Sequence, residues 1–174
     1  TLSAFFLAVW KLLLYQHSGQ NDIITGMVYR GRPEKEFDTA IGYFVNMIPV
    51  RFKIEKKQPI TEFIKQLQIT ILDGMEHGEY PFPNIVRELK IPRDSSVNPV
   101  FQVGYYYQNY DLNETEESKI YKEAYPVEII EDIQQEGEYD LIMEVRESKS
   151  GCPICFKYDE NIFKQITIKR LAKK

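Results

Sequence analysis

A strand-like alternation that leads directly into a helix-like periodicity constrains the fold of this chain more than any other feature. From residue 48 to 54 every second side chain is apolar, and the intervening ones include Arg51 and Lys53. From residue 60 to 75 apolar side chains instead recur at steps of three and four. The first pattern is typical of a half-buried strand and the second of an amphipathic helix. Pro49 cannot donate to a ladder, so this strand is predicted to lie at a sheet edge or to carry a bulge.

The rest of the chain continues this mixture, with helices and strands interleaved early and strands dominant late. Further helices are predicted over residues 1–15, 35–41, 82–89 and 161–174, and further strands over 22–29, 100–108, 127–131, 138–147 and 151–159. Gly19 is expected to cap the first helix, and the acidic stretch 111–119 is expected to form a surface loop. We therefore predict one α/β unit over residues 1–174, a two-layer mixed sheet with covering helices.

Composition and charge exclude several classes of partner. The 174 residues carry a formal net charge of −4, whereas nucleic-acid binders neutralise phosphates with a basic face. No apolar run reaches the roughly 20 residues needed to cross a bilayer, and residues 1–14 are apolar but lack a basic leader. We expect neither a nucleic-acid nor a membrane partner, and a cytoplasmic location.

The two cysteines form a Cys-x-x-Cys spacing at Cys152 and Cys155. A thioredoxin-type site places its first cysteine at a helix N-terminus, but the flanking alternation here predicts a strand, with the two thiols on opposite faces. A zinc site would need two further ligands, and the histidines, His17 and His77, are distant in sequence. We expect two reduced structural cysteines and no metal.

Three dense segments occupy residues 41–51, 77–82 and 93–101. They read Ile-Gly-Tyr-Phe-Val-Asn-Met-Ile-Pro-Val-Arg, His-Gly-Glu-Tyr-Pro-Phe and Arg-Asp-Ser-Ser-Val-Asn-Pro-Val-Phe. In this order and spacing they resemble the last three sequence motifs of nonribosomal peptide synthetase condensation domains. Weaker similarity at residues 13–23, 31–32, 137–141 and 158–170 extends the resemblance over essentially the whole chain. The chain departs from the usual motif residues at Gly78, Glu79, Pro83 and Val97.

The catalytic signature of that family, His-His-x-x-x-Asp-Gly, lies upstream of these motifs and has no counterpart here, since the sequence contains no His-His pair. The resemblance therefore implies the C-terminal lobe of a condensation domain, without its N-terminal lobe. It implies a lobe that resembles chloramphenicol acetyltransferase, a mixed sheet packed against helices. We expect no catalytic residue in this chain and no activity from the chain by itself.

The resemblance also implies what the intact domain does. It would form amide bonds between aminoacyl or peptidyl units, delivered on the phosphopantetheine arms of peptidyl carrier proteins during peptide antibiotic biosynthesis. No cofactor is expected to bind this chain directly. The residues that the resemblance marks as motif or channel positions are Gly42, Phe44, Asn46, Arg51, His77, Pro81, Phe82, Arg93, Asp94, Asn98, Pro99, Phe101 and Gln102.

Several of these positions have a simpler reading beside the functional one. His77 either acts in the chemistry or ties the end of a helix to the Pro81 turn, and the second reading is favoured because the family's base lies elsewhere. Asn46 either projects into the channel, where its amide can donate and accept, or bonds its own backbone at the strand entry. Arg51 either pairs with an anionic group or is simply solvated. Arg93 and Asp94 are expected to form a fixed pair.

Two alternatives to an amide-forming domain stay open. The chain could belong to a degenerate condensation-like module that recruits a carrier or tailoring protein, or to a free-standing acyltransferase whose site lies between subunits. The absent histidine signature argues against the second. Because a lobe cut from its partner exposes apolar surface, self-association is expected.

Overall fold

The computed structural model describes residues 1–32, 34–92, 94, 96–109, 139–149 and 151–173. Its helices are α1 (Leu2–Ser18), the 3-10 helix η1 (Lys35–Phe37), α2 (Ile60–Glu76), α3 (Phe82–Glu88) and α5 (Gln165–Leu171); its strands are β1 (Asp22–Tyr29), β2 (Asn46–Lys53), β3 (Val103–Gln108), β4 (Leu141–Arg146) and β5 (Ile154–Tyr158). The predicted strand 127–131 and the predicted loop 111–119 lie outside the described residues.

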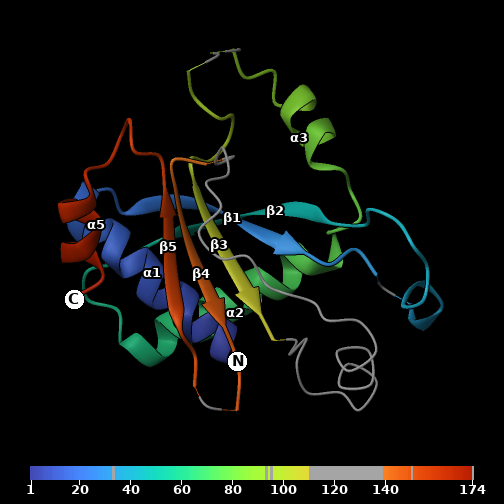
Figure 1. Ribbon diagram of the computed structural model, residues 1–174, viewed down its shortest axis with the longest axis horizontal. Coiled ribbons are helices and arrows are strands. Elements are labelled where there is room, and N and C mark those ends of the chain that lie inside the picture. The colour runs from blue at the N-terminus through green and yellow to red at the C-terminus, as the bar shows by residue number, and fades with distance from the viewer. Residues whose placement is uncertain (33, 93, 95, 110–138, 150, 174) are drawn as a thin grey trace, which may run out of the picture.

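The described strands form one mixed sheet in the order β2-β1-β3-β4-β5 (Figure 1). β1 pairs antiparallel with β2 and parallel with β3, β3 pairs parallel with β4, and β4 pairs antiparallel with β5. β2 is an edge strand, and its Pro49 lies opposite Gly26. This confirms the position predicted from a residue that cannot donate to a ladder.

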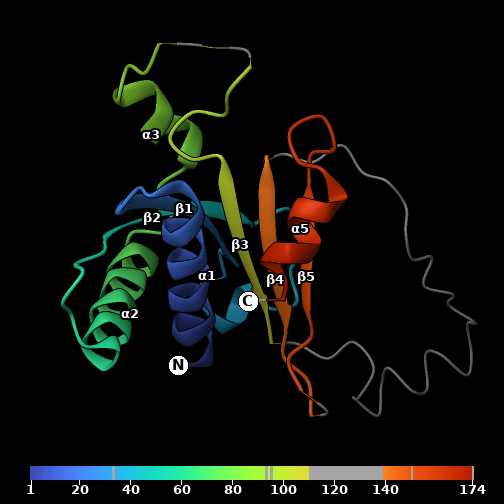
Figure 2. The same cartoon turned by 90° about the vertical axis from the view of Figure 1, so that its left-hand side faces the viewer.

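Helices α1 and α2 cover one face of this sheet, which confirms the predicted two-layer arrangement (Figures 1 and 2). The core between the layers is apolar and includes Leu7, Trp10, Met27, Val50, Leu67, Tyr105, Met143 and Val145, joined by Ile168 and Leu171 of α5. In α2 the buried side chains Phe63, Leu67 and Ile71 follow a four-residue step, as the periodicity predicted. At its two ends Ile60 and Met75 are exposed.

Both ends of α1 are capped by local hydrogen bonds. The Thr1 hydroxyl accepts from the Ala4 N–H at 3.2 Å, and the Gly19 N–H donates to the Tyr15 carbonyl at 2.9 Å. Gly19 has φ 70°, in the left-handed region where glycine carries no Cβ penalty. The predicted cap is therefore confirmed.

Several predicted boundaries were wrong. The 3-10 helix covers Lys35–Phe37 rather than residues 35–41, and α5 begins at Gln165, after a turn over residues 159–163. β3 begins at Val103 rather than at residue 100, because Val100 adopts φ 72° and interrupts the extended backbone. Helix α3 projects beyond the sheet (Figures 1 and 2).

The strand predicted over residues 151–159 is shorter in the structure, since β5 covers Ile154–Tyr158, so it includes Cys155 but not Cys152. Cys152 is half-buried and packs against the core, whereas Cys155 is exposed and opposite Glu144 in the β4–β5 register. Both thiols are free. Among the described residues, no helix combines the length and the apolar character that crossing a bilayer requires.

Candidate functional site

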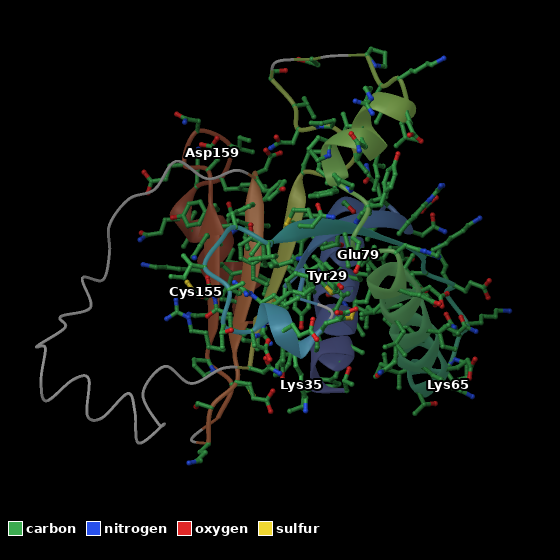
Figure 3. The ribbon with its side chains drawn as sticks, turned by 90° about the vertical axis from the view of Figure 1, so that its right-hand side faces the viewer. Tyr29, Lys35, Lys65, Glu79, Cys155 and Asp159 are labelled. Carbon is green, nitrogen blue, oxygen red and sulfur yellow. The ribbon has the colours of Figure 1, made fainter. Side chains whose placement is uncertain are left out.

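The structure brings parts of the three motif segments together at one end of the β1–β2 pair. Asn46, the first residue of β2, lies opposite Tyr29, the last residue of β1. The loop over residues 77–82 joins α2 to α3 at this end, and Figure 3 shows Glu79 of that loop and Tyr29 of β1. We call residues 77–82, which end with the first residue of α3, the α2–α3 loop.

Asn46 binds the backbone of the α2–α3 loop through both functions of its side-chain amide. Its Nδ2 donates to the carbonyl of Gly78 at 2.8 Å and to the carbonyl of Tyr80 at 2.8 Å. Its Oδ1 accepts from the N–H of Phe82 at 3.1 Å. Because an amide nitrogen carries two N–H groups, both donors are used. These bonds go to a segment more than thirty residues away in sequence and not to the backbone of Asn46 itself, and the channel position of Asn46 stays a prediction.

Gly78 fixes the same loop by close approach. A Cβ at this position would lie 2.8 Å from Cδ1 of Tyr29 and 3.0 Å from the Met75 carbonyl oxygen. Only glycine therefore allows the loop to lie directly against the Tyr29 ring. The departure from the family residue at position 78 thus has a local reason in this chain.

His77 ends α2 and contributes its backbone rather than its ring to the turn. Its carbonyl accepts from the Tyr80 N–H at 3.1 Å, and its side chain is exposed. Pro81 carries no N–H and precedes α3 as its N-cap residue. The structural role predicted for His77 fits this geometry, although the ring itself takes no part in it.

An aromatic cluster joins the second and third motif segments. The Phe101 ring packs against Phe82 with centroids 5.1 Å apart and against Tyr139 at 5.2 Å. Phe101 is only 1% exposed. Its ring lies on the Gly26 backbone, on the sheet face opposite α1, because the neighbouring Thr25 points toward Lys11 of α1.

The chain enters β3 through a tight turn in the third motif. The Phe101 N–H donates to the Pro99 carbonyl at 2.9 Å across Val100, whose φ is 72°. A bond that spans two residues around a positive φ is a γ-turn, a rare and strained conformation for a β-branched residue. Gln102 Nε2 donates to the Asn98 carbonyl at 2.8 Å and supports this turn.

Arg93, the predicted partner of Asp94, lies outside the described residues. Asp94 accepts from the N–H of Ser96 at 2.9 Å and from its hydroxyl at 2.6 Å. These hydrogen bonds hold the pKa of Asp94 below its ordinary value. Asp94 is thus a turn residue that stabilises its own segment.

Gly42 and Phe44 lie apart from the Asn46 contacts, in the β1–β2 connection. The Phe44 ring packs against Phe37 with centroids 5.7 Å apart, and the Arg32 guanidinium lies 4.2 Å from the Phe44 ring centroid. A Cβ at Gly42 would lie 3.0 Å from this ring. These residues shape the connection itself.

Arg51 pairs with a carboxylate, away from Asn46. Its Nη2 lies 2.7 Å from Asp22 Oδ2, and both side chains are exposed. The hydrogen bond from Arg51 holds the pKa of Asp22 below its ordinary range. Arg30 pairs in the same way with Asp38 at 2.7 Å. These arginines have carboxylate partners within the chain.

The sequence analysis did not predict the burial of two charged residues, Lys11 and Glu144. Lys11 of α1 is fully buried and its ammonium donates to the Ile23 carbonyl at 3.0 Å, the Thr25 hydroxyl at 3.0 Å and the Val50 carbonyl at 2.9 Å. Burial lowers the pKa of Lys11 from 10.5 to about 7, against a smaller opposite effect of Asp22. Helical periodicity gave no sign of this, because a lysine in an amphipathic pattern is expected at the surface.

Glu144 of β4 is the second, and it lies on the sheet face opposite the core. Its side chain is buried and meets Arg146 Nε at 2.7 Å and Lys157 Nζ at 2.5 Å. Burial alone would raise the pKa of Glu144, but the hydrogen bonds from Lys157 and Arg146 hold it below its ordinary value. Among the described residues, no three His, Cys, Asp or Glu side chains gather as metal ligands would.

Comparison with known proteins places this arrangement in a family. The family described as "Condensation domain" matches residues 1–174, and this chain belongs to it. The polyketide synthase PksN of Bacillus subtilis (strain 168) is 39% identical over 171 residues, which cover 97% of this chain and 3% of that protein.

Solved structures agree on the fold. A four-domain nonribosomal peptide synthetase, holo-AB3403 bound to AMP and glycine, matches with a TM-score of 0.86 at 23% identity, over 99% of this chain and 14% of that one. The condensation domain of the Monacolin K polyketide synthase MokA matches with a TM-score of 0.79 at 18% identity, over 99% of this chain and 39% of that one. The chain thus spans about two fifths of a solved condensation domain.

Proposed function

We propose that this chain is the C-terminal lobe of a condensation domain that forms an amide bond between two carrier-bound substrates. The observation that carries the proposal is the family match over residues 1–174 in a chain that spans only 39% of a solved condensation domain. The order of the three motif segments, which resemble the last three of the family, supports the C-terminal position.

The reaction would join a thioester and an amine. The amine nitrogen attacks the thioester carbonyl, the C–N bond forms, the C–S bond breaks, the amine loses a proton and the carrier's thiol is released. Holding the two reactants together supplies much of the acceleration. This lobe would supply one wall of the chamber, and the proton transfer would fall to the His-His-x-x-x-Asp-Gly signature of the other lobe.

The β1–β2 connection is the surface that we assign to the other lobe. Ile41 is fully exposed and Tyr43 is 89% exposed, and Phe37 and Val45 nearby are also exposed. Contiguous exposed apolar surface of this kind often marks a contact with another protein surface. Burial of Ile41 and Tyr43 against the N-terminal lobe would account for their exposure here.

Carrier proteins would be the further partners. Their phosphopantetheine arms would bring both substrates to the channel, and this chain would hold no cofactor of its own. Arg51 and Arg30, which could meet a phosphate, are already paired with Asp22 and Asp38. We therefore assign the recognition of the arms to other groups of the intact domain.

The test uses the complete condensation domain of the parent synthetase with two carriers, one loaded with an acyl or aminoacyl group and one with an amino acid. We expect mass spectrometry of the acceptor carrier to show the amide product, and we expect a variant without the second signature histidine to lose it. A complete domain that binds both carriers but forms no amide would contradict the proposal and favour a recruiting module.

A further inference from the structure

The side-chain amide of Asn46 bonds the α2–α3 loop through both its nitrogen and its oxygen. Its Nδ2 donates to the Gly78 and Tyr80 carbonyls and its Oδ1 accepts from the Phe82 N–H. With both N–H groups used, the side chain has no donor left for a substrate carbonyl. Both donors of Asn46 are therefore committed to the loop, and the loop is the element through which they act.

The loop is held by contacts of two further kinds. Gly78 lies against the Tyr29 ring, where a Cβ would approach Cδ1 to 2.8 Å. Phe82, the last loop residue, packs on Phe101, whose ring is itself fixed on the Gly26 backbone. The backbone of the loop is thus held from the strand side, while His77 and Glu79 are exposed. A loop with a fixed backbone and exposed polar side chains is preformed for contact with something outside the lobe.

We propose that Asn46 is a positioning residue: it holds the α2–α3 loop in the conformation that the reaction chamber requires, and it does not contact the reacting atoms. The proposal rests on the proposed function for the meaning of the chamber. Hydrogen exchange tests the hydrogen bonds of Asn46 separately, without a measurement of amide formation. Asn46 and Gly78 therefore hold the same loop: Asn46 holds it through hydrogen bonds, and Gly78 allows it to pack closely against Tyr29.

The first measurement is hydrogen exchange of the complete domain. Asn46→Ala removes the acceptor of the Phe82 N–H, so exchange in the peptides that cover residues 78–82 should accelerate at least tenfold. Asn21→Ala is the matched control, because Asn21 lies at the other end of the β1–β2 pair and its side-chain amide makes a long, 3.5 Å contact with the Ile54 carbonyl. Unchanged exchange of residues 78–82 in the Asn46→Ala variant would overturn the proposal.

The second measurement is amide formation by the same variants. A misplaced wall lowers kcat/KM by roughly 10- to 100-fold, so we expect that loss from Asn46→Ala and, independently, from Gly78→Ala. The double variant should be less than about threefold worse than the poorer single one, since both disrupt one element. Tyr29→Leu should restore part of the activity of Gly78→Ala by making room for its Cβ.

The outcomes separate two failures. A multiplicative loss in the Asn46→Ala, Gly78→Ala double variant would mean that Asn46 acts directly on the substrate, and would overturn the positioning role. If the unaltered domain forms no amide, the proposed function fails, but the exchange of residues 78–82 still decides whether Asn46 holds the loop. The melting temperature of each variant shows whether a loss of activity reflects unfolding.

Discussion

The ring of Phe101 lies so close to the backbone of Gly26 that a Cβ at Gly26 would stand 2.0 Å from Cε2 of Phe101. Phe101 cannot withdraw, because it is buried between Phe82 and Tyr139. This contact locks the third motif segment onto the centre of the sheet, where β1 meets β3 at Gly26 and Gly104.

Gly26→Ala should therefore be strongly destabilising, by about 3 kcal/mol or more, as for an overpacked core. Phe101→Leu leaves space and should offset part of this cost. Urea unfolding of the two single variants and the double variant would measure the coupling, expected at about 1 kcal/mol or more. Strictly additive effects would mean that the two residues do not meet.

Val100→Gly should have little effect on stability, although glycine usually weakens a β-branched position. The left-handed conformation of Val100 costs roughly 1–3 kcal/mol, and glycine removes this strain while it adds chain entropy and loses a half-buried side chain. We expect a net change within ~1 kcal/mol. Val103→Gly in β3 is the control and should cost ~2 kcal/mol or more. Equal losses at both positions would contradict the γ-turn.

Lys11 should make stability rise with pH above neutrality. Its pKa is lowered to about 7 in the fold, whereas an unfolded lysine keeps its proton to about pH 10.4. Between these values the unfolded chain binds more protons, so the free energy of unfolding increases with pH by up to about 1.4 kcal/mol per pH unit. Lys11→Met should remove this rise, and Lys65→Met on exposed α2 should not. If the free energy of unfolding of wild type and of Lys11→Met changed with pH in the same way, burial would not lower the pKa of Lys11.

Self-association of the separate chain should depend on the β1–β2 connection. Replacement of the exposed Ile41 and Tyr43 by serine removes apolar surface, and light scattering should then show a lower mean mass at high concentration. Leu89→Ser serves as the control, because Leu89 is also exposed but lies at the end of α3. A wild-type chain that is monomeric at high concentration would contradict the expectation.

Most of the fold was predictable from local pattern, because periodicity reports which face of an element is buried. The edge position of β2 followed from Pro49, and the exposure of Cys155 beside the half-buried Phe156 followed from strand alternation. The failures come from long-range packing. The γ-turn at Val100 is imposed by the site of Phe101 on Gly26, and a β-branched residue after proline gives no local hint of a positive φ.

The candidate site was predictable as a set of residues but not as a geometry. The motif segments identified Asn46, Phe82 and Phe101, which do converge. The partners of Asn46 lie 32 to 36 residues away, and no local pattern could select them. Lys11 was missed for the same reason, since its acceptors belong to β1 and β2.

One measurement tests most directly whether these residues are half of a reaction chamber. The purified chain and the separately produced N-terminal lobe of the parent domain would each be assayed with loaded carriers, alone and together. We predict that amide product appears only when both lobes are present and that this chain alone gives none. Turnover by this chain alone, at a rate near that of the complete domain, would contradict the account.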